Sequence, residues 1–436
     1  MINKQNWKEK QIGDHCLVGD GAHASIKRYE QGIMYLTSKN FKSGGLDLSK
    51  IDYISESDYA KYFKKGLKAL TKPESGDVLF SIIGTIGEPY LFKSQDCFGL
   101  SSSVSILRPD KSIIFPKYLF YWIQGHIFQN ALYSIKGGVA QSYVSLEMIK
   151  SLPLSFPPIP AQKKITDILS AYDDRIENNT RRIKILEEMA QMLYREWFVN
   201  FRFPNHENVK MVESAIGLIP EGWEVVKLGN HITTQKGYAF KSEWYQDYGV
   251  PIVKASNFTD DSIDITNLVS ISEEIAQQYK KYELKSNEII IQTVGSWASN
   301  PQSVVGKVIR TPRQAEGALL NQNAVKIFPQ NSINLAFLFY CLKREEFKSY
   351  IVGCGQGAAS QASITLDAIK AFEILLPSSS LLKLFEKTIY PNWELINNLR
   401  VKNINLRKTR DLLLPKLISG EIDVENLDIE TVAAAA

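Results

Sequence analysis

Several signatures that would assign a catalytic role are missing from this sequence of 436 residues. It contains no GxxxxGK[ST] loop to cradle phosphates, no GxSxG nucleophile elbow and no HExxH zinc motif. The Asn-Pro-Pro-aromatic signature of amino-methyltransferases is also absent, since Asn300-Pro301-Gln302 only begins it. With 5 histidines in the chain, a histidine-based catalytic site has few candidates. These absences argue against nucleotide hydrolysis, acyl transfer and methyl transfer by the chain itself.

Cysteine and long apolar runs are scarce as well. The 4 cysteines form no CxxC pair and no cysteine–histidine spacing typical of zinc ligands, so we expect free thiols and no metal. No segment approaches the roughly 18 consecutive apolar residues of a transmembrane helix. The N-terminus, MINKQNWKEK, is polar and lacks the apolar stretch of a signal peptide. We therefore expect a cytoplasmic protein.

The charge is nearly balanced and unevenly distributed. The formal net charge is +4 at pH 7. Residues 1–160 carry 19 basic and 14 acidic side chains, whereas residues 204–380 carry 16 basic and 18 acidic ones. Binding of a polyanion by the second half must therefore depend on a local basic patch, or on a more basic partner.

The most regular feature that is present is a long helical segment. Ala161 to Phe203 contains neither proline nor glycine and carries apolar residues in steps of four and three, as coiled coils do. The seam positions are Ile165, Leu169, Tyr172, Ile176, Asn179, Ile183, Leu186, Ala190, Leu193 and Trp197. At about 1.5 Å per residue the helix would be about 60 Å long, so it needs an equally long partner to cover its apolar stripe.

A weaker copy of this seam recurs 220 residues later. Its positions are Phe385, Ile389, Asn392, Ile396, Leu399, Asn403, Leu406, Arg410, Leu413 and Leu417. Upstream of each seam, QSYVSLEMIKSLPLSFP (141–157) aligns without a gap on QASITLDAIKAFEILLP (361–377). The chain is therefore an internal duplication, and its second long helix is the expected partner of the first.

Asparagines interrupt both seams, at Asn179, Asn392 and Asn403. A buried asparagine can fix the register of two paired helices and the choice of partner, at some cost in stability. Alternatively, the seam opens to solvent at these positions. The sequence leaves both interpretations open.

Two globular regions of the same design precede the two helices. Trp7 and Trp223 open equivalent runs, and short β-branched strands and an amphipathic helix follow in the same order. The predicted fold class is α+β, with two tandem mixed α/β domains separated by two long helices that pair as an antiparallel coiled coil in a pseudo-twofold internal repeat. The expected boundaries are 1–158 and 204–378 for the domains, 159–203 and 379–425 for the helices, and 426–436 for a flexible tail.

The antiparallel orientation follows from the length of the connection. The second domain starts directly after the first helix and ends directly before the second. A domain of about 175 residues has a radius of gyration of roughly 16 Å. It cannot join helix ends that lie about 60 Å apart. The end of the first helix and the start of the second must therefore be neighbours, which would place the two domains at opposite ends of a rod.

Polar loops after apolar strands are the candidate binding positions. Lysine, asparagine, glutamine and serine side chains are those that reach base edges and phosphates. Ordinary polar loops would have the same composition, so the loops alone do not decide. The candidates are Lys39, Asn40, Gly84, Thr85, Gly87, Lys136, Gln141, Lys254, Ser256, Asn257, Gly295, Ser296, Trp297 and Gln361.

With these features the chain resembles the specificity (S) subunit of a type I restriction-modification system. The resemblance rests on the tandem order of variable domain and long helix, on the runs Trp7 to Gly13 and Trp223 to Gly229, and on the closing pattern that leads from Gln141 into the first helix. It covers nearly the whole chain. The second copy departs from the first in having Ser378-Ser379-Ser380 where the first has Pro158-Ile159-Pro160.

The resemblance implies a recognition subunit without catalytic activity. Each domain would read one half of an asymmetric bipartite site in double-stranded DNA, and the coiled coil would set the gap. The helices would dock two methyltransferase subunits, with restriction-translocase subunits joining through them. No cofactor would bind the chain directly, since S-adenosylmethionine and ATP belong on the partner subunits. The seam and docking residues would include Ile165, Leu169, Ile176, Asn179, Ile183, Leu186, Leu193, Ile389, Ile396, Leu399, Leu406 and Leu413.

The nearly neutral second half leaves a different class of function open. A symmetric protein-interaction scaffold that never touches DNA would have the same repeat and the same helices. An enzyme with an unrecognised site is a third class, but the sequence offers no residue cluster for it. The salt dependence of duplex binding would separate the first two, because only phosphate neutralisation gives a steep slope.

Overall fold

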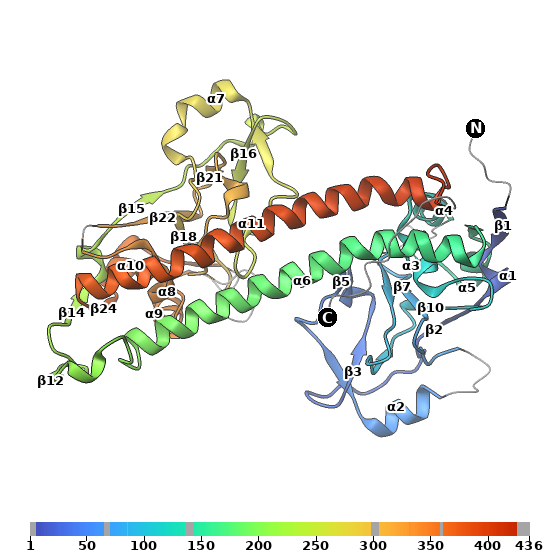
Figure 1. Cartoon of the computed structure of the whole chain (residues 1–436), viewed down its shortest axis with the longest axis horizontal. Helices are drawn as coiled ribbons and strands as arrows, with labels where there is room; N and C mark the ends of the chain where they lie inside the picture. The colour runs from blue at the N-terminus through green and yellow to red at the C-terminus, as the bar shows by residue number, and fades with distance from the viewer. Residues whose placement is uncertain are drawn as a thin grey trace. The chain divides into compact units, whose positions relative to one another are not determined.

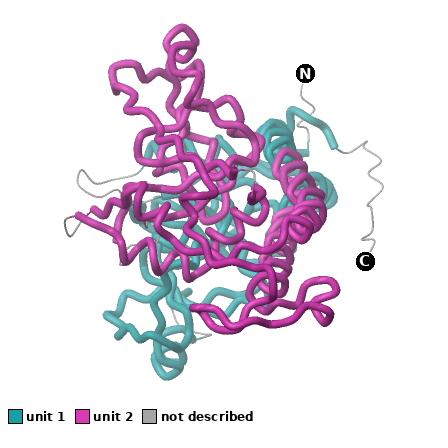
Figure 2. Tube along the Cα trace, turned by 90° about the vertical axis from the view of Figure 1, so that its left-hand side faces the viewer, with its two compact units in different colours: residues 1–177, 404–436 teal, residues 178–403 magenta. Residues whose placement is uncertain are grey.

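The structure is a computed structural model that describes residues 6–64, 70–84, 86–135, 143–297, 305–330, 332–357 and 361–424. It divides into two compact units (Figure 2). Unit 1 comprises residues 1–177 and 404–436, and unit 2 comprises residues 178–403. Two long helices, α6 (Ile159–Phe198) and α11 (Ser379–Ile418), each contribute one end to each unit (Figure 1).

The globular domain of unit 1 is a mixed α/β structure. Its helical segments are α1 (Ile12–His15), η1 (Ser38–Asn40), α2 (Glu56–Tyr62), α3 (Pro116–Gln124), α4 (His126–Ile135) and α5 (Leu146–Lys150). Its strands are β1 (Lys8–Gln11), β2 (Cys16–Asp20), β3 (Ile33–Leu36), β4 (Phe41–Lys42), β5 (Gly45–Leu46), β6 (Asp52–Ile54), β7 (Val78–Ser81), β8 (Pro89–Leu91), β9 (Phe98–Leu100), β10 (Val104–Pro109) and β11 (Pro153–Phe156).

Unit 2 is built in the same way. Its helical segments are η2 (His206–Asn208), η3 (Leu228–Asn230), η4 (Ser242–Trp244), η5 (Ala255–Asn257), α7 (Glu273–Gln278), η6 (Lys280–Tyr282), η8 (Arg313–Ala315), α8 (Leu335–Leu342), α9 (Glu345–Gly353) and α10 (Leu366–Ala371). Its strands are β12 (Met211–Ser214), β13 (Gly217–Pro220), β14 (Glu224–Lys227), β15 (Ile232–Lys236), β16 (Val250–Val253), β17 (Val269–Ile271), β18 (Ile289–Gln292), β19 (Val294–Gly295), β20 (Val308–Arg310), β21 (Leu319–Leu320), β22 (Ala324–Pro329), β23 (Ala362–Ser363) and β24 (Glu373–Leu376).

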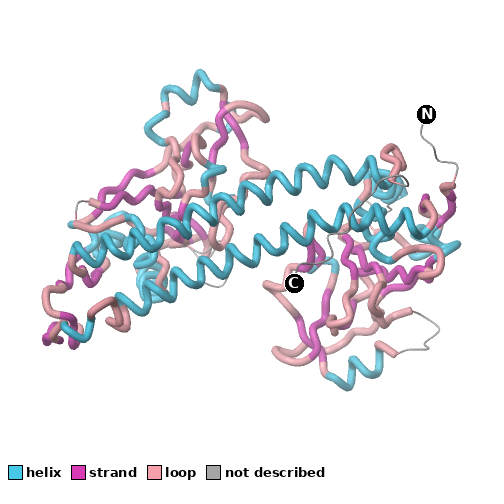
Figure 3. Tube along the Cα trace, in the orientation of Figure 1, coloured by secondary structure: helices cyan, strands magenta, loops and turns pink. Residues whose placement is uncertain are grey.

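The sheets confirm the internal duplication. The order β2-β10-β7-β8 in unit 1 matches β15-β22-β18-β20 in unit 2, and all neighbours in both are antiparallel. A three-stranded sheet also recurs, β6-β3-β9 and β17-β16-β21, each with one parallel pair. The strands of each sheet are short and separated by loops (Figure 3). Because both copies keep the same strand order, differences between them are concentrated in the loops and side chains.

The duplicated closing motif forms equivalent structure because its caps are equivalent. The Ser145 hydroxyl accepts a hydrogen bond from the Met148 N–H at the start of α5, and the Thr365 hydroxyl accepts one from the Ala368 N–H at the start of α10. Such N-caps satisfy a backbone donor that the helix leaves free, and each contributes about 1 kcal/mol.

The long helices pair antiparallel in both units, as predicted. In unit 1, Ile165 near the start of α6 shares an apolar core with Leu414 and Leu417 near the end of α11. In unit 2, Tyr194 near the end of α6 lies 6.0 Å from Phe385 near the start of α11, between ring centroids. The start of one helix therefore meets the end of the other each time.

The seam differs from the predicted one in detail. Of the twelve seam and docking residues predicted above, six are buried, namely Ile165, Leu169, Ile176, Ile389, Ile396 and Leu399. The other six are only partly buried, namely Asn179, Ile183, Leu186, Leu193, Leu406 and Leu413. Next to two of the seam positions, Tyr194 and Trp393 are more deeply buried than Leu193 and Asn392. In those places each helix also covers a globular domain, so its apolar face is wider than a two-helix seam.

The seam asparagines form a hydrogen-bonded pair. The Asn179 Nδ2 donates to the Asn403 Oδ1 at 2.8 Å, and the Asn403 Nδ2 donates to the Thr180 Oγ1 at 3.2 Å. Asn403 is buried. The geometry favours the register interpretation, because a shift of one helix along the other would leave a buried amide unpaired.

Proline interrupts α11 without ending it. Pro391 lies in the interior of the helix, where it cannot donate the backbone hydrogen bond of its turn. No helix in the described ranges is long and apolar enough to cross a membrane.

Candidate nucleic-acid interface

A short turn joins two strand ends in each unit and gathers the predicted loops around it. In unit 1 this junction turn is residues 101–103: the Ser101 N–H donates to the Leu36 carbonyl at the end of β3, and the Ile82 N–H after β7 donates to the Ser103 carbonyl, both at 2.9 Å. In unit 2 the junction turn is residues 321–323. There the Asn321 N–H donates to the Val253 carbonyl at the end of β16 at 2.9 Å, and the Thr293 N–H after β18 donates to the Asn323 carbonyl at 2.8 Å.

Two glycines make room for these turns. An added Cβ at Gly21 would lie 2.1 Å from the Leu100 carbonyl oxygen, and one at Gly237 would lie 2.1 Å from the Asn321 carbonyl oxygen. Both positions follow the first strand of the four-stranded sheet. Only glycine permits such a close approach of two backbones.

In unit 1 the junction turn brings Lys39 and Gly84 together. Lys39 is exposed on η1, beside Ser38, whose N–H donates to the Ser103 Oγ at 2.9 Å. Gly84 is exposed with φ +78°, and an added Cβ there would find the Ser38 Oγ as its nearest neighbour at 4.0 Å. The predicted residues Thr85, Lys136 and Gln141 lie outside the described residues.

Unit 2 brings more of the predicted set together. Gly295 on β19 pairs with Ala362 on β23, directly after the exposed Gln361. The ring of Trp297 lies against Gly355, since an added Cβ on Gly355 would be 3.0 Å from it. Ser296 lies between Gly295 and Trp297. Lys254, the N-cap residue of η5, follows Val253 directly, and the exposed Ser256 lies on η5 itself.

Three predicted residues serve the loops themselves. The Asn40 side chain is buried, where its Oδ1 accepts from the Thr37 N–H at 2.9 Å and its Nδ2 donates to two backbone carbonyls at 3.0 Å. Asn257 accepts from the Lys254 N–H in the same way. Gly87 is buried with φ +96°, and an added Cβ would lie 2.6 Å from the Gln129 Oε1. Asn40, Asn257 and Gly87 therefore have structural roles in their own loops.

Beside the junction turn, unit 2 carries a surface that the sequence analysis missed. We call it the aromatic–lysine face; it comprises Tyr238, Trp244, Tyr245, Tyr279 and Tyr282 with Lys241, Lys254 and Lys281. Three of its rings surround Tyr279, whose centroid lies 4.4 Å from that of Tyr238, 5.7 Å from that of Trp244 and 6.4 Å from that of Tyr282. All five rings are partly buried, because one side of each packs on the core of the three-stranded sheet. The Tyr238 N–H donates to the Leu320 carbonyl, one residue before the junction turn.

Lysine ammonium groups lie against these rings. The Lys254 Nζ is 4.0 Å from the ring centroid of Tyr245, the Lys281 Nζ 5.0 Å from that of Tyr282 and the Lys241 Nζ 5.4 Å from that of Trp244. Lys241 also forms an exposed ion pair with Glu243 at 3.4 Å, which contributes little in water. The face therefore places three ammonium groups against aromatic rings in a domain whose sequence has a small acidic excess.

Unit 1 has a counterpart on the equivalent sheet and on α2. There the Arg28 guanidinium carbon lies 3.9 Å from the ring centroid of Tyr35, which is itself buried, and the Lys61 Nζ lies 4.9 Å from that of the half-buried Tyr62. Burial raises the pKa of the Tyr59 hydroxyl to about 12, and the nearby Cys97 contributes to the same shift. Its hydroxyl stays neutral at physiological pH. Rings that stack on bases combined with cations that meet phosphates are the chemistry of nucleic-acid surfaces.

The family profile described as the type I restriction-modification DNA specificity domain matches residues 4–188 and 220–381. The chain belongs to this family. The two matched segments are the two repeats, so the specificity domain is present twice. The role of a specificity subunit is recognition rather than catalysis, as the missing catalytic motifs predict.

Relatives agree with this assignment, and a solved structure shares the fold. The chain is 25% identical to the MjaIX specificity subunit of Methanocaldococcus jannaschii, over 97% of this chain and 95% of that one. It is 24% identical to the HindI specificity subunit of Haemophilus influenzae, over 96% and 100%. The fold is similar to that of the crystal structure of an S subunit from M. genitalium, with a TM-score of 0.53, 15% identity and coverage of 94% and 96%.

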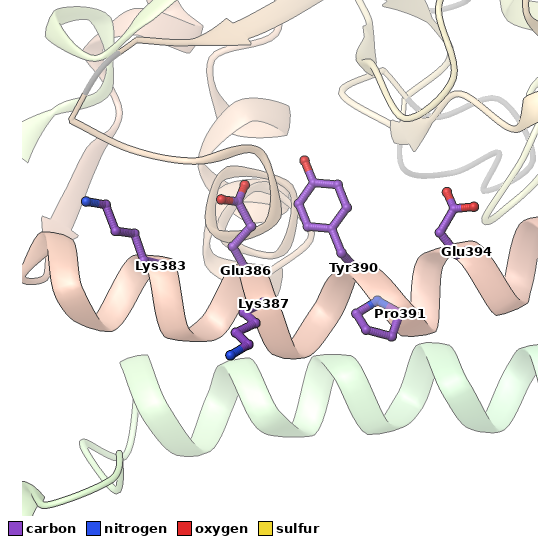
Figure 4. Close-up of a pocket in the computed structure, with 6 residues that line it drawn as sticks. All are labelled: Lys383, Glu386, Lys387, Tyr390, Pro391 and Glu394. Carbon is purple, nitrogen blue, oxygen red and sulfur yellow. The ribbon is translucent and has the colours of Figure 1, made fainter.

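This specificity subunit has a shallow groove along α11. Lys383, Glu386, Lys387, Tyr390, Pro391 and Glu394 line it (Figure 4). Charges of both signs alternate along the helix beside an exposed proline ring, which suits contact with another protein. Within the described residues, no group of three or more His, Cys, Asp or Glu side chains could hold a metal.

Proposed function

We propose that this chain directs a type I methyltransferase to an asymmetric bipartite site in double-stranded DNA. Each globular domain reads one half of the site, and the paired helices set the gap between the halves. The observation that carries the proposal is that equivalent junction turns, 101–103 and 321–323, are surrounded by different side chains in the two units. A shared scaffold with different surface chemistry is what two unlike half-sites require.

The DNA-contacting residues we propose combine the predicted loops with the aromatic surfaces. In unit 2 they are Lys254, Ser256, Ser296, Trp297, Gln361 and the aromatic–lysine face. In unit 1 they are Lys39, Gly84, Arg28 and the Lys61–Tyr62 pair. Asn40, Asn257 and Gly87 are left out, because the fold occupies them.

Exposed apolar side chains support partner docking on α6. Ile185, Met189 and Met192 are 47%, 50% and 59% exposed and are spaced so that they lie on one face of the helix. Contiguous exposed apolar residues of this kind mark protein contacts. We assign the helix surfaces to two methyltransferase subunits, with restriction-translocase subunits joining through them, and S-adenosylmethionine and ATP bound by those partners. Its DNA substrate places the complex in the cytoplasm.

Genome-wide mapping of modified bases tests the proposal. Cells that express this chain with its cognate methyltransferase are compared with cells that express the methyltransferase alone. The expected result is a new asymmetric motif with two defined halves and one fixed gap. An active methyltransferase that gives no new motif in the presence of this chain would refute it.

A further inference from the structure

The two repeats attach their globular domains to the long helices with opposite chemistry. In unit 1 the attachment uses Gln162 of α6, which is fully buried. Its Nε2 donates to the carbonyls of Ile113 and Pro157, both at 2.8 Å, and its Oε1 accepts from the Phe115 N–H at 2.7 Å. One helix side chain therefore satisfies two backbone groups just before α3 and one just after β11.

In unit 2 the amide has moved from the helix to the domain. The position equivalent to Gln162 is Leu382, and the position equivalent to Phe115 is Asn334. The Asn334 Nδ2 donates to the Leu382 carbonyl at 2.6 Å, while its Oδ1 caps α8 by accepting from the Phe337 N–H at 2.9 Å. The side-chain amide thus belongs to the helix in unit 1 and to the domain in unit 2, where its partner is the main-chain carbonyl of Leu382 and not the Leu382 side chain.

A second contact between domain and helix also exchanges its donor and acceptor between the two repeats. In unit 1 the Tyr121 hydroxyl donates to the Asp173 carboxylate at 2.6 Å, and the Arg410 Nη1 of α11 donates to the same carboxylate at 2.5 Å. In unit 2 the equivalent tyrosine, Tyr340, accepts from the indole Nε1 of Trp393 at 2.9 Å. Trp393 occupies the position equivalent to Asp173.

A residue on the other long helix matches this difference in size and charge. The position equivalent to Arg410 in unit 2 is Ala190, which is buried in one core with Trp393. Unit 1 pairs the Asp173 carboxylate with Arg410, whereas unit 2 has the large indole of Trp393 beside the small Ala190 at the equivalent positions. Arg310 of the same domain completes the site, with its guanidinium carbon 4.5 Å from the Trp393 ring centroid.

We propose that these positions form a pairing code that assigns each recognition domain to its own site on the helices. The polar docking set, Gln162, Asp173 and Arg410, fits domain 1. The apolar docking set, Leu382, Trp393 and Ala190, fits domain 2. Domain 1 on the apolar docking set would leave the Phe115 N–H and the Ile113 carbonyl without the amide that satisfies them, and buried groups of this kind are costly to leave unpaired.

The code fixes the order of the two half-sites. This consequence rests on the proposed function: since each domain reads a different half, a domain confined to one docking set keeps the bipartite motif in one order. The six residues are positioning residues, because they hold the domains and touch no DNA themselves.

An exchange of the two domains tests the code. In the exchanged chain, residues 204–378 precede α6 and residues 1–158 connect α6 to α11. In the compensated chain, the docking sets are exchanged as well, by Gln162→Leu, Asp173→Trp, Ala190→Arg, Leu382→Gln, Trp393→Asp and Arg410→Ala. Each full chain is produced with the cognate methyltransferase; its melting temperature is measured in purified complex and its motif is mapped in cells.

The exchanged chain is expected to melt below the natural chain and to give no motif. The compensated chain is expected to recover the melting temperature and to methylate a motif whose halves are in reversed order. Two results overturn the code: an exchanged chain that is as stable and active as the natural one, or a compensated chain that is no better than the uncompensated one.

A single substitution gives an independent reading that does not depend on domain exchange. Gln162→Leu should loosen domain 1 alone, so that the first half-site becomes degenerate while the second stays defined; equal loss of both halves, or of neither, would contradict the code.

If the natural chain gives no motif in this assay, the proposed function fails, and the melting temperatures of the exchanged and compensated chains still decide the pairing.

Discussion

The aromatic–lysine face makes a quantitative prediction about salt. Lys241, Lys254 and Lys281 lie on the same face of unit 2, each within 5.4 Å of an aromatic ring centroid. If each neutralises one phosphate, replacing all three by glutamine removes three counterion-releasing contacts from the complex. Glutamine keeps much of the side-chain volume, so the rings keep their neighbours while the charge is lost.

The size of the effect follows from polyelectrolyte theory. Each phosphate contact contributes about −0.9 to the slope of log affinity against log salt concentration. The triple variant should therefore flatten that slope by about 2.7. At about 0.15 M salt, one contact of this kind corresponds to about a fivefold change in affinity, so the three together should weaken binding about 150-fold.

The assay is equilibrium binding of a labelled duplex containing the mapped motif, at several salt concentrations, with the specificity subunit in complex with its methyltransferase. A matched control is Lys227→Gln with Lys348→Gln, two exposed lysines of the same domain outside the face. The reasoning is refuted if the triple variant keeps the natural slope, or if the control lowers the slope by a similar amount per charge.

Three further predictions concern single positions. Gly237→Ala should destabilise unit 2 and abolish recognition of one half-site, because its Cβ would meet the Asn321 carbonyl oxygen at 2.1 Å; Gly353→Ala, with open space around it, should do neither, as thermal melting and motif mapping would reveal. Pro391→Ala should raise the free energy of unfolding by up to about 3 kcal/mol in chemical denaturation, since it restores a helical hydrogen bond; no increase would mean that α11 has already adapted to the proline. Asn403→Leu should destabilise the helix pair by about 1–3 kcal/mol, because the Asn179 amide loses its partner, and an unchanged melting temperature would argue for a solvated seam instead.

Periodicity was sufficient to predict the long helices and their antiparallel pairing. The seam from Ile165 onward requires a partner, and the length of the second domain leaves only one orientation. The prediction of individual seam residues was less good: Tyr194 and Trp393, not Leu193 and Asn392, are deeply buried. A heptad pattern assumes one neighbour, whereas here each helix end also covers a domain.

The loops were found, but the role of each side chain in them was not. Asn40 and Lys39 are adjacent polar residues in the same loop, yet one is buried in a cap and the other is exposed. Nothing in the local sequence distinguishes a capping asparagine from a base-reading one, because the distinction depends on carbonyls seven and ten residues away.

By itself the sequence determined the repeat, the starts of the two long helices and the absence of known catalytic motifs, because these depend on local spacing and residue type. The ends of the helices were predicted too late, at 203 and 425, whereas the helices end at Phe198 and Ile418. Only the tertiary structure decided which surfaces face solvent together. The rings of Tyr238 and Tyr279 are 41 positions apart, and Asp173 and Arg410 are 237 apart, yet each pair is in contact. Such contacts arise from sheet pairing and helix packing over long sequence separations, where no local pattern records them.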